Sequence, residues 1–109
     1  MAFDEGLAER VRSVLKGERS LQEKRMFGGL AFMVKGQMCC GVLKKDLVLR
    51  LGSEDYTKCV AHPHVRPMNF TGRSMRGFLY VGAGGVRTSR QLEAWIGKSL
   101  RFVSTLPKK

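Results

Sequence analysis

Five side chains carry the most reactive groups in the sequence. Cys39 and Cys40 are adjacent, and Cys59, His62 and His64 form a second group. Thiolates and imidazoles are preferred zinc ligands, but structural zinc sites bring them in spaced pairs such as C-x-x-C, and a proline separates the two histidines here. We therefore expect a loop with exposed histidines and neither a metal ion nor another cofactor, with zinc binding as the alternative.

Catalytic pairs are also weakly indicated. Cys59 and His62 could be written as a nucleophile and its base, yet any chain with several cysteines and histidines permits such a pair. Glu54 and Asp55 are neighbours at a predicted helix start, where the helix dipole already explains two carboxylates. The expectation is a protein that is not an enzyme.

A glycine-rich loop, residues 82–85, lies between a predicted strand and a predicted helix. In the dinucleotide-binding pattern G-x-G-x-x-G the third glycine would fall at Arg87, and no parallel β-α-β unit surrounds the loop. The helix start at residues 87–90 could still hold a phosphate or a carboxylate. A solvated helix cap is the main interpretation, and a small anionic ligand at this loop is the weaker alternative.

The cysteines also indicate the redox environment. Their number is odd, and Cys39 and Cys40 lie next to each other in a predicted strand, where a disulfide would strain the backbone. Alternation along a strand predicts that their side chains point to opposite faces of the sheet. Reduced cysteines that act as small apolar side chains fit a cytoplasmic protein.

The charge is strongly positive and unevenly distributed. The formal net charge is +11; residues 1–56 contain ten basic and eight acidic side chains, whereas residues 57–109 contain ten basic side chains and a single acid, Glu93. Such a surface favours an anionic partner, whether nucleic acid, an acidic protein or a phosphate-bearing ligand. Because many basic proteins bind nucleic acid weakly and without specificity, charge does not choose among them.

The element that organises the chain is a predicted meander over residues 26–51. Three apolar, β-prone runs are separated by polar turns at residues 35–37 and 44–46, which is typical of three antiparallel strands. Small residues on one side of the second strand, Gly41 among them, predict close approach by a helix or by another subunit.

Other elements must cover this meander. In chain order we predict a helix over residues 4–16 capped by Asp4, a polar connector over 18–24, a helix over 53–60 capped by Ser53, an edge strand over 68–70, a strand over 77–81 and a helix over 88–106 that opens with a capping box. The order α-β-β-β-α-β-β-α indicates a two-layer α+β fold, an antiparallel sheet with packed helices.

Residues 1–109 suffice for a single domain. The expectation is a protein without a membrane partner, since no apolar run approaches the roughly 18 residues of a membrane span.

Arginines near predicted turns are the leading binding candidates. Arg73 and Arg76 flank a turn beside Phe70 and Phe78, and guanidinium groups beside aromatic rings are used to bind nucleic acid and acidic peptides. A solvated hairpin end is the alternative. The full set of candidate partner-binding or nucleic-acid-binding residues is Arg25, Arg66, Arg73, Arg76, Arg87 and Arg90.

Arg50 is interpreted differently, because it lies inside a predicted strand. A charged side chain at such a position needs a partner or an exit to solvent. We expect Arg50 to belong to a structural ion pair rather than to contact a ligand.

The meander and the segments after it resemble a known family. The residues that carry the resemblance are Met26, Phe27, Gly28 and Gly29, then Met38, Cys39, Cys40 and Gly41, then Arg50, Leu51 and Gly52, then the run 66–73, and Tyr80 with Val81. In this pattern the chain is similar to the N-terminal domain of the TfoX (Sxy) competence regulators over nearly its whole length.

The resemblance implies a secretion-chaperone-like two-layer fold, a class whose members often form homodimers. It also implies a non-enzymatic regulatory domain that contacts a protein of the transcription machinery, as the family's regulators do beside the cyclic-AMP receptor protein at competence promoters. Those regulators carry a further C-terminal helical domain, and we expect this chain to be a stand-alone N-terminal-type domain. Direct, largely non-specific nucleic-acid binding through the basic C-terminal half is the alternative function.

Overall fold

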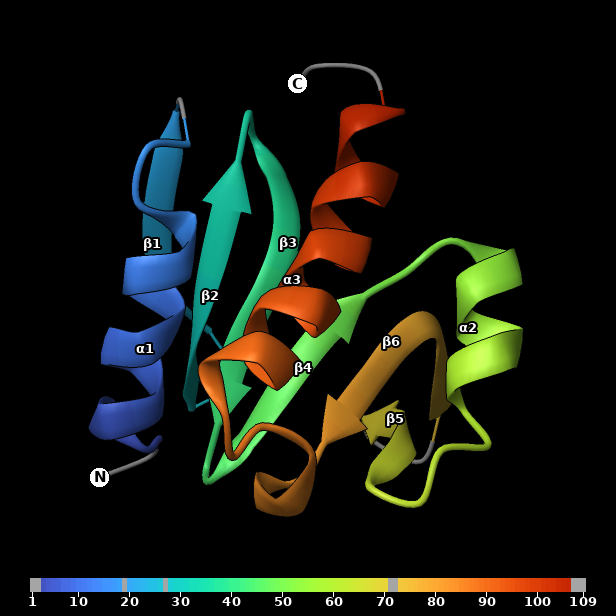
Figure 1. The fold of residues 1–109 in the computed structure, drawn as a ribbon. Coiled ribbons are helices and arrows are strands. Elements are labelled where there is room, and N and C mark those ends of the chain that lie inside the picture. The colour runs from blue at the N-terminus through green and yellow to red at the C-terminus, as the bar shows by residue number, and fades with distance from the viewer. Residues whose placement is uncertain (1–2, 19, 27, 71–72, 107–109) are drawn as a thin grey trace.

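The computed structural model describes residues 3–18, 20–26, 28–70 and 73–106, with the backbone alone for Met26 and for residues 68–70 and 73–76. The elements are, in chain order, α1 (Glu5–Leu15), β1 (Leu21–Met26), β2 (Gly29–Val34), β3 (Gln37–Leu43), β4 (Asp46–Arg50), α2 (Ser53–Cys59), β5 (Val65–Phe70), β6 (Arg73–Val81), the 3₁₀ helix η1 (Ala83–Gly85) and α3 (Ser89–Ser104). Within these residues, six strands form one antiparallel sheet in the order β1-β2-β3-β4-β6-β5 (Figure 1). The predicted α+β class is confirmed.

The predicted meander is strands β2, β3 and β4, which pair antiparallel with their neighbours. Lys35 and Gly36, between β2 and β3, have φ values of 54° and 80°. Positive φ at both central residues is the geometry that matches a two-residue turn to the twist of its strands.

One strand of the sheet was predicted as a connector. Strand β1 is polar, with Leu21 as its apolar start, and it pairs with β2 along its whole length, from Leu21 opposite Val34 to Met26 opposite Gly29. An edge strand needs little apolar surface of its own, because its backbone hydrogen bonds come from the neighbouring strand. The order is therefore α-β-β-β-β-α-β-β-α, one strand more than predicted.

The hydrophobic core lies between one face of the sheet and the helices. A cross-strand row on this face consists of Leu30, Val42, Leu47 and Val81, all buried. Leu7, Val11 and Leu15 of α1 and Leu92, Ile96 and Val103 of α3 belong to the same buried cluster. Figure 1 shows α1 and α3 side by side in front of the sheet, with α2 beside β6.

The two adjacent cysteines both join this core, so the prediction that they point to opposite faces is wrong. The pairing of β2 with β3 shifts its register between Phe32 and Met33, where Cys40 lies opposite Phe32 and Met38 opposite Met33. A bulge inserts one residue and interrupts the alternation of side chains. Cys39 and Cys40 are therefore both fully buried in the same cluster.

Two of the predicted helix caps are confirmed. The Asp4 carboxylate accepts a hydrogen bond from the Leu7 N–H at 3.0 Å, and Thr88 and Gln91 form the reciprocal bonds of a capping box. For α2 the cap is Gly52, without a side-chain hydrogen bond, and Ser53 is the first helical residue. Among the described residues no helix is both long enough and apolar enough to cross a membrane.

Candidate interaction surfaces

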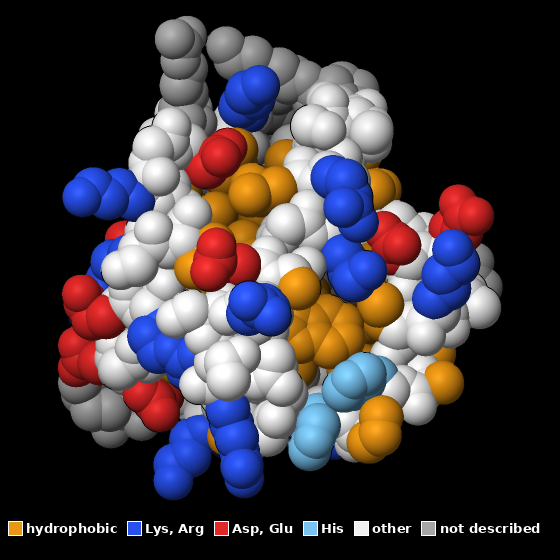
Figure 2. Space-filling model, in the orientation of Figure 1, with side chains coloured by type: hydrophobic (Ala, Val, Ile, Leu, Met, Phe, Trp, Pro, Cys, Tyr) orange, Lys and Arg blue, Asp and Glu red, His pale blue; other side chains and the backbone are white. Residues whose placement is uncertain are grey.

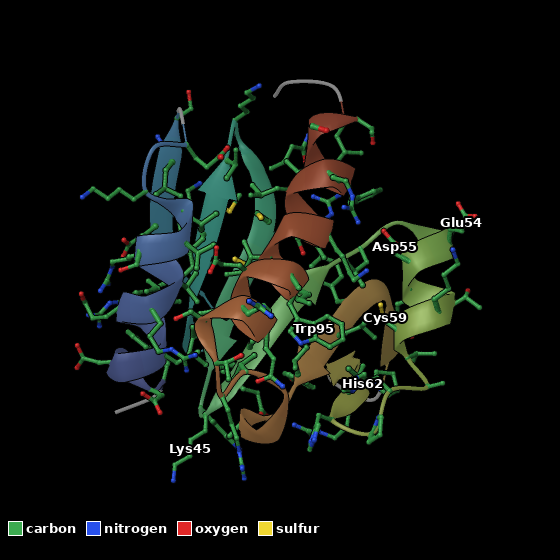
Figure 3. The ribbon with its side chains drawn as sticks, viewed as in Figure 1. Lys45, Glu54, Asp55, Cys59, His62 and Trp95 are labelled. Atoms are coloured by element: carbon green, nitrogen blue, oxygen red, sulfur yellow. The ribbon has the colours of Figure 1, made fainter. Side chains whose placement is uncertain are left out.

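Cys59, His62 and Trp95 gather where α2, the loop after it and α3 meet (Figure 3). The His62 and Trp95 rings stand edge to face with centroids 5.3 Å apart, and the indole N–H of Trp95 donates to the Gly85 carbonyl oxygen at 3.0 Å. The Nδ1 atom of His62 accepts a hydrogen bond from the backbone N–H of His64 at 3.2 Å. The contacts of His62 therefore join the loop to α3.

The candidate metal-binding and catalytic residues do not form one site, because Cys59 and His62 lie near Trp95 whereas Cys39 and Cys40 are buried in β3. Burial raises the pKa of the Cys59 thiol, and a hydrogen bond with Cys39, together with burial, raises that of Cys40. In the part of the chain that the structure describes, no three histidine, cysteine or acidic side chains are placed to hold a metal ion. Figure 3 shows Glu54 pointing away from the molecule and Asp55 pointing toward α3.

The glycine-rich loop, residues 82–85, is shaped by packing against His64. A Cβ atom at Gly84 would lie 2.5 Å from the His64 ring, and one at Gly85 would lie 3.0 Å from the His64 Cβ. The Gly82 N–H donates to the His64 carbonyl oxygen at 2.8 Å. Sequence reasoning missed this contact because the pairing of β5 with β6 brings the two segments together.

Arg50, at the end of β4, lies between aromatic rings. Its guanidinium carbon is 5.9 Å from the ring centroid of Phe78 and 5.6 Å from that of Phe102, and its side chain donates to the Gln37 amide oxygen at 3.2 Å. None of the ion pairs found among the described residues includes Arg50, so the expected carboxylate partner is replaced here by an amide and two rings. Cation–π contacts of this kind stabilise a half-buried guanidinium. Phe102 and Gly52 also line an adjacent hollow of about 440 Å³.

The second face of the sheet carries no helix among the described residues. A cross-strand row on this face consists of Ala31, Gly41, Val48 and Tyr80. Alternation places the row opposite the one that packs beneath the helices. Ala31 and Val48 are buried, whereas Tyr80 and the nearby Leu43 are half-exposed. We call this surface the helix-free face.

Arg66, one of the predicted binding arginines, lies at the β5 edge of the helix-free face. Its guanidinium carbon is 4.9 Å from the centroid of the Tyr80 ring, and it forms an ion pair with Asp46. The side chain keeps more than half of its surface exposed. An arginine that is held in place and still accessible is suited to contact a partner.

A second surface lies at the end of the molecule that carries the turn between β3 and β4. We call it the basic end, and it comprises Arg10, Arg25, Lys44, Lys45 and Arg87. Lys45 points away from the fold there (Figure 3), and Figure 2 shows lysine and arginine side chains gathered at this end. Lys44, Lys45 and Phe3 line one hollow, and the Phe3 ring centroid is 5.9 Å from the Arg25 guanidinium carbon.

The structure separates the predicted binding arginines. Arg25 and Arg66 lie on the two outermost strands of the sheet, β1 and β5. Arg87 and Arg90 are exposed near the start of α3. For Arg73 and Arg76 the structure describes the backbone alone, within β6, and the Phe27 position predicted from the family pattern lies outside the described residues.

Sequence reasoning missed Arg10, Lys44 and Lys45 as candidate binding residues. The signal that could have pointed to Lys44 and Lys45 is their position in a predicted turn. Arg10 carried no such signal, because its proximity to Lys45 and Arg87 depends on how α1 packs against α3.

Comparison with known proteins identifies one family. The sequence pattern of the TfoX N-terminal domain family matches residues 13–103, which is most of the chain. This family is a regulatory type of domain. A search of curated proteins finds no match.

Proposed function

The chain belongs to the TfoX N-terminal domain family, and from that premise we propose that it is a non-enzymatic domain that regulates transcription by contact with a protein partner. Competence-type control is the expected process. The helix-free face is the proposed contact surface.

The observation that carries this proposal is the composition of the helix-free face. The buried Ala31, Gly41 and Val48 make the middle of this face apolar, and the half-exposed Tyr80 and Leu43 are the accessible apolar side chains beside them. Interface cores are enriched in aromatic residues and depleted in charge, and their rims are polar. Arg66 on the edge strand β5 and its ion-pair partner Asp46 at the start of β4 supply the polar groups of such a rim.

A pull-down with the immobilised chain tests the proposal, using purified cyclic-AMP receptor protein and RNA polymerase. We expect one of them to be retained at moderate salt, and Leu43→Lys to reduce retention about tenfold, because a charge would be buried in the contact. The matched control is Leu106→Lys, since Leu106 is also half-exposed but lies just after α3, away from the helix-free face. Retention of neither protein, or equal loss in both variants, would contradict the proposal.

A homodimer through the helix-free face is the competing occupant. Light scattering of the free chain distinguishes it, because Leu43→Lys would then convert a dimer into a monomer.

The second candidate function is direct nucleic-acid binding, favoured by the exposed Lys44, Lys45 and Arg87 at the basic end.

A further inference from the structure

The basic end contains a hollow of about 360 Å³ between α1, the β3–β4 turn and the segment that leads from η1 into α3. Three of the residues that line it are cationic, namely Arg10, Lys45 and Arg87. They come from three separate parts of the chain. Convergence of three cations on one hollow costs electrostatic free energy unless an anion neutralises them.

Arg10 is positioned for this role by the backbone. The side chain is half-buried, and its NH2 group donates to the Val86 carbonyl oxygen at 2.6 Å. A guanidinium has five N–H donors, so this bond fixes the group and leaves others for a ligand. Arg87 follows Val86 directly, so the same backbone segment orients both arginines.

A single acidic side chain, Asp4, lines this hollow, so the lining carries three positive charges against one negative charge. Asp4 accepts the hydrogen bond from the Leu7 N–H that caps α1. Among the described residues, no ion pair includes Arg10, Lys45 or Arg87. Lys44 and Lys45 line a further hollow of about 220 Å³ next to Phe3 and Asp4, which increases the excess of positive charge.

We propose that this hollow binds the phosphate group of a small phosphorylated ligand. A phosphate offers acceptor oxygens to the guanidinium groups of Arg10 and Arg87 and a charge to Lys45. This site uses none of the residues of the helix-free face, and it goes beyond the proposed contact with a protein.

The test is an NMR titration of the backbone amides with inorganic phosphate, pyrophosphate, adenosine monophosphate and adenosine. We expect the three phosphate-bearing probes to shift amides around residues 4–10, 44–46 and 85–88 saturably. Tighter binding of adenosine monophosphate than of phosphate would identify a nucleotide as the source of the group, whereas equal binding would identify phosphate itself. Both results support the site. Adenosine that binds as well as its monophosphate would overturn it.

A pair of charge-matched variants separates this site from the general attraction of a basic protein for anions. The double variant Lys45→Gln, Arg87→Gln should weaken pyrophosphate binding at least about tenfold, because two charge-assisted contacts are lost. The control Lys24→Gln, Lys58→Gln removes the same charge from exposed positions in β1 and α2 and should change the affinity less than about twofold. Equal weakening of pyrophosphate binding in both double variants would overturn the proposal. It would also be overturned if no amide shift saturates up to about 10 mM of the phosphate-bearing probes, a concentration that corresponds to a binding free energy of about −3 kcal/mol.

Discussion

Two glycines of the family pattern, Gly29 and Gly41, occupy positions where a neighbouring strand leaves no room for a side chain. A Cβ atom at Gly41 would lie 2.7 Å from the Leu30 carbonyl oxygen, and one at Gly29 would lie 2.5 Å from that of Val42. The close approach predicted at Gly41 therefore comes from strand β2, and neither a helix nor another subunit is needed to explain it. Both glycines serve the geometry of the sheet.

Substitution at Gly41 tests this role. We expect Gly41→Ala to lower the free energy of unfolding by about 1–3 kcal/mol, because the contact is with backbone that cannot rotate away. Urea unfolding followed by Trp95 fluorescence measures the change. The control is Gly97→Ala in α3, where nothing lies within 4 Å of the added Cβ atom. There we expect a gain of about 0.5–1 kcal/mol from helix propensity, and a loss of equal size at both positions would contradict the explanation.

Among the elements, α1 and the edge strand β1 are tied together by one ion pair. The Arg12 side chain donates to both oxygens of Glu23, at 2.7 and 2.9 Å, and also pairs with Glu9. The hydrogen bond from Arg12 lowers the pKa of Glu23 below its usual value. Strand β1, which is polar, thus gains a contact with the helix layer that its sequence did not indicate.

The lowered pKa of Glu23 makes the contribution of the Arg12–Glu23 ion pair to stability depend on pH. A carboxylate whose pKa is depressed in the folded state adds stability above its unfolded-state pKa and loses it as the pH falls through the folded-state value. Because the pair is partly exposed, we expect Glu23→Gln to cost about 0.5–1 kcal/mol at pH 7 and nearly nothing at about pH 2. Urea unfolding at both pH values measures this. The control is Glu18→Gln, because Glu18 is exposed and belongs to none of the ion pairs found among the described residues. A loss of stability in Glu23→Gln that persists at low pH would contradict the assignment.

At the scale of the whole molecule, the net charge of +11 dominates the response to polyanions. The described cations lie on the basic end and also on β1, β5 and α2, so they are spread over several elements. Binding that depends on total charge is steep in salt and indifferent to sequence.

We therefore expect DNA to bind weakly, with an affinity whose logarithm falls linearly with the logarithm of salt concentration. Fluorescence anisotropy at several salt concentrations measures this for two unrelated sequences. The two charge-matched double variants should weaken DNA binding equally, in contrast to their effect on pyrophosphate. A sequence preference, or loss confined to Lys45→Gln, Arg87→Gln, would contradict this view and favour a dedicated nucleic-acid site at the basic end.

Local sequence signals were sufficient for much of the fold. The meander follows from apolar runs between turns, and the caps at Asp4 and Thr88 follow from side chains that bond to backbone groups a few residues away. Strand β1 was missed because its pairing with β2, rather than its own side chains, makes it a strand. The bulge at Cys39 and Cys40 was missed because a prediction from alternation assumes regular pairing without an inserted residue.

The sequence by itself determined the α+β class, the antiparallel meander, the excess of positive charge and the family pattern, because each depends on residue types at short spacing. Only the tertiary structure decided that Gly84 packs on His64, that Arg50 lies between two rings, and that Arg10, Lys45 and Arg87 line one hollow. These contacts join residues far apart in the chain, and their geometry depends on how the helices and the last hairpin pack on the sheet.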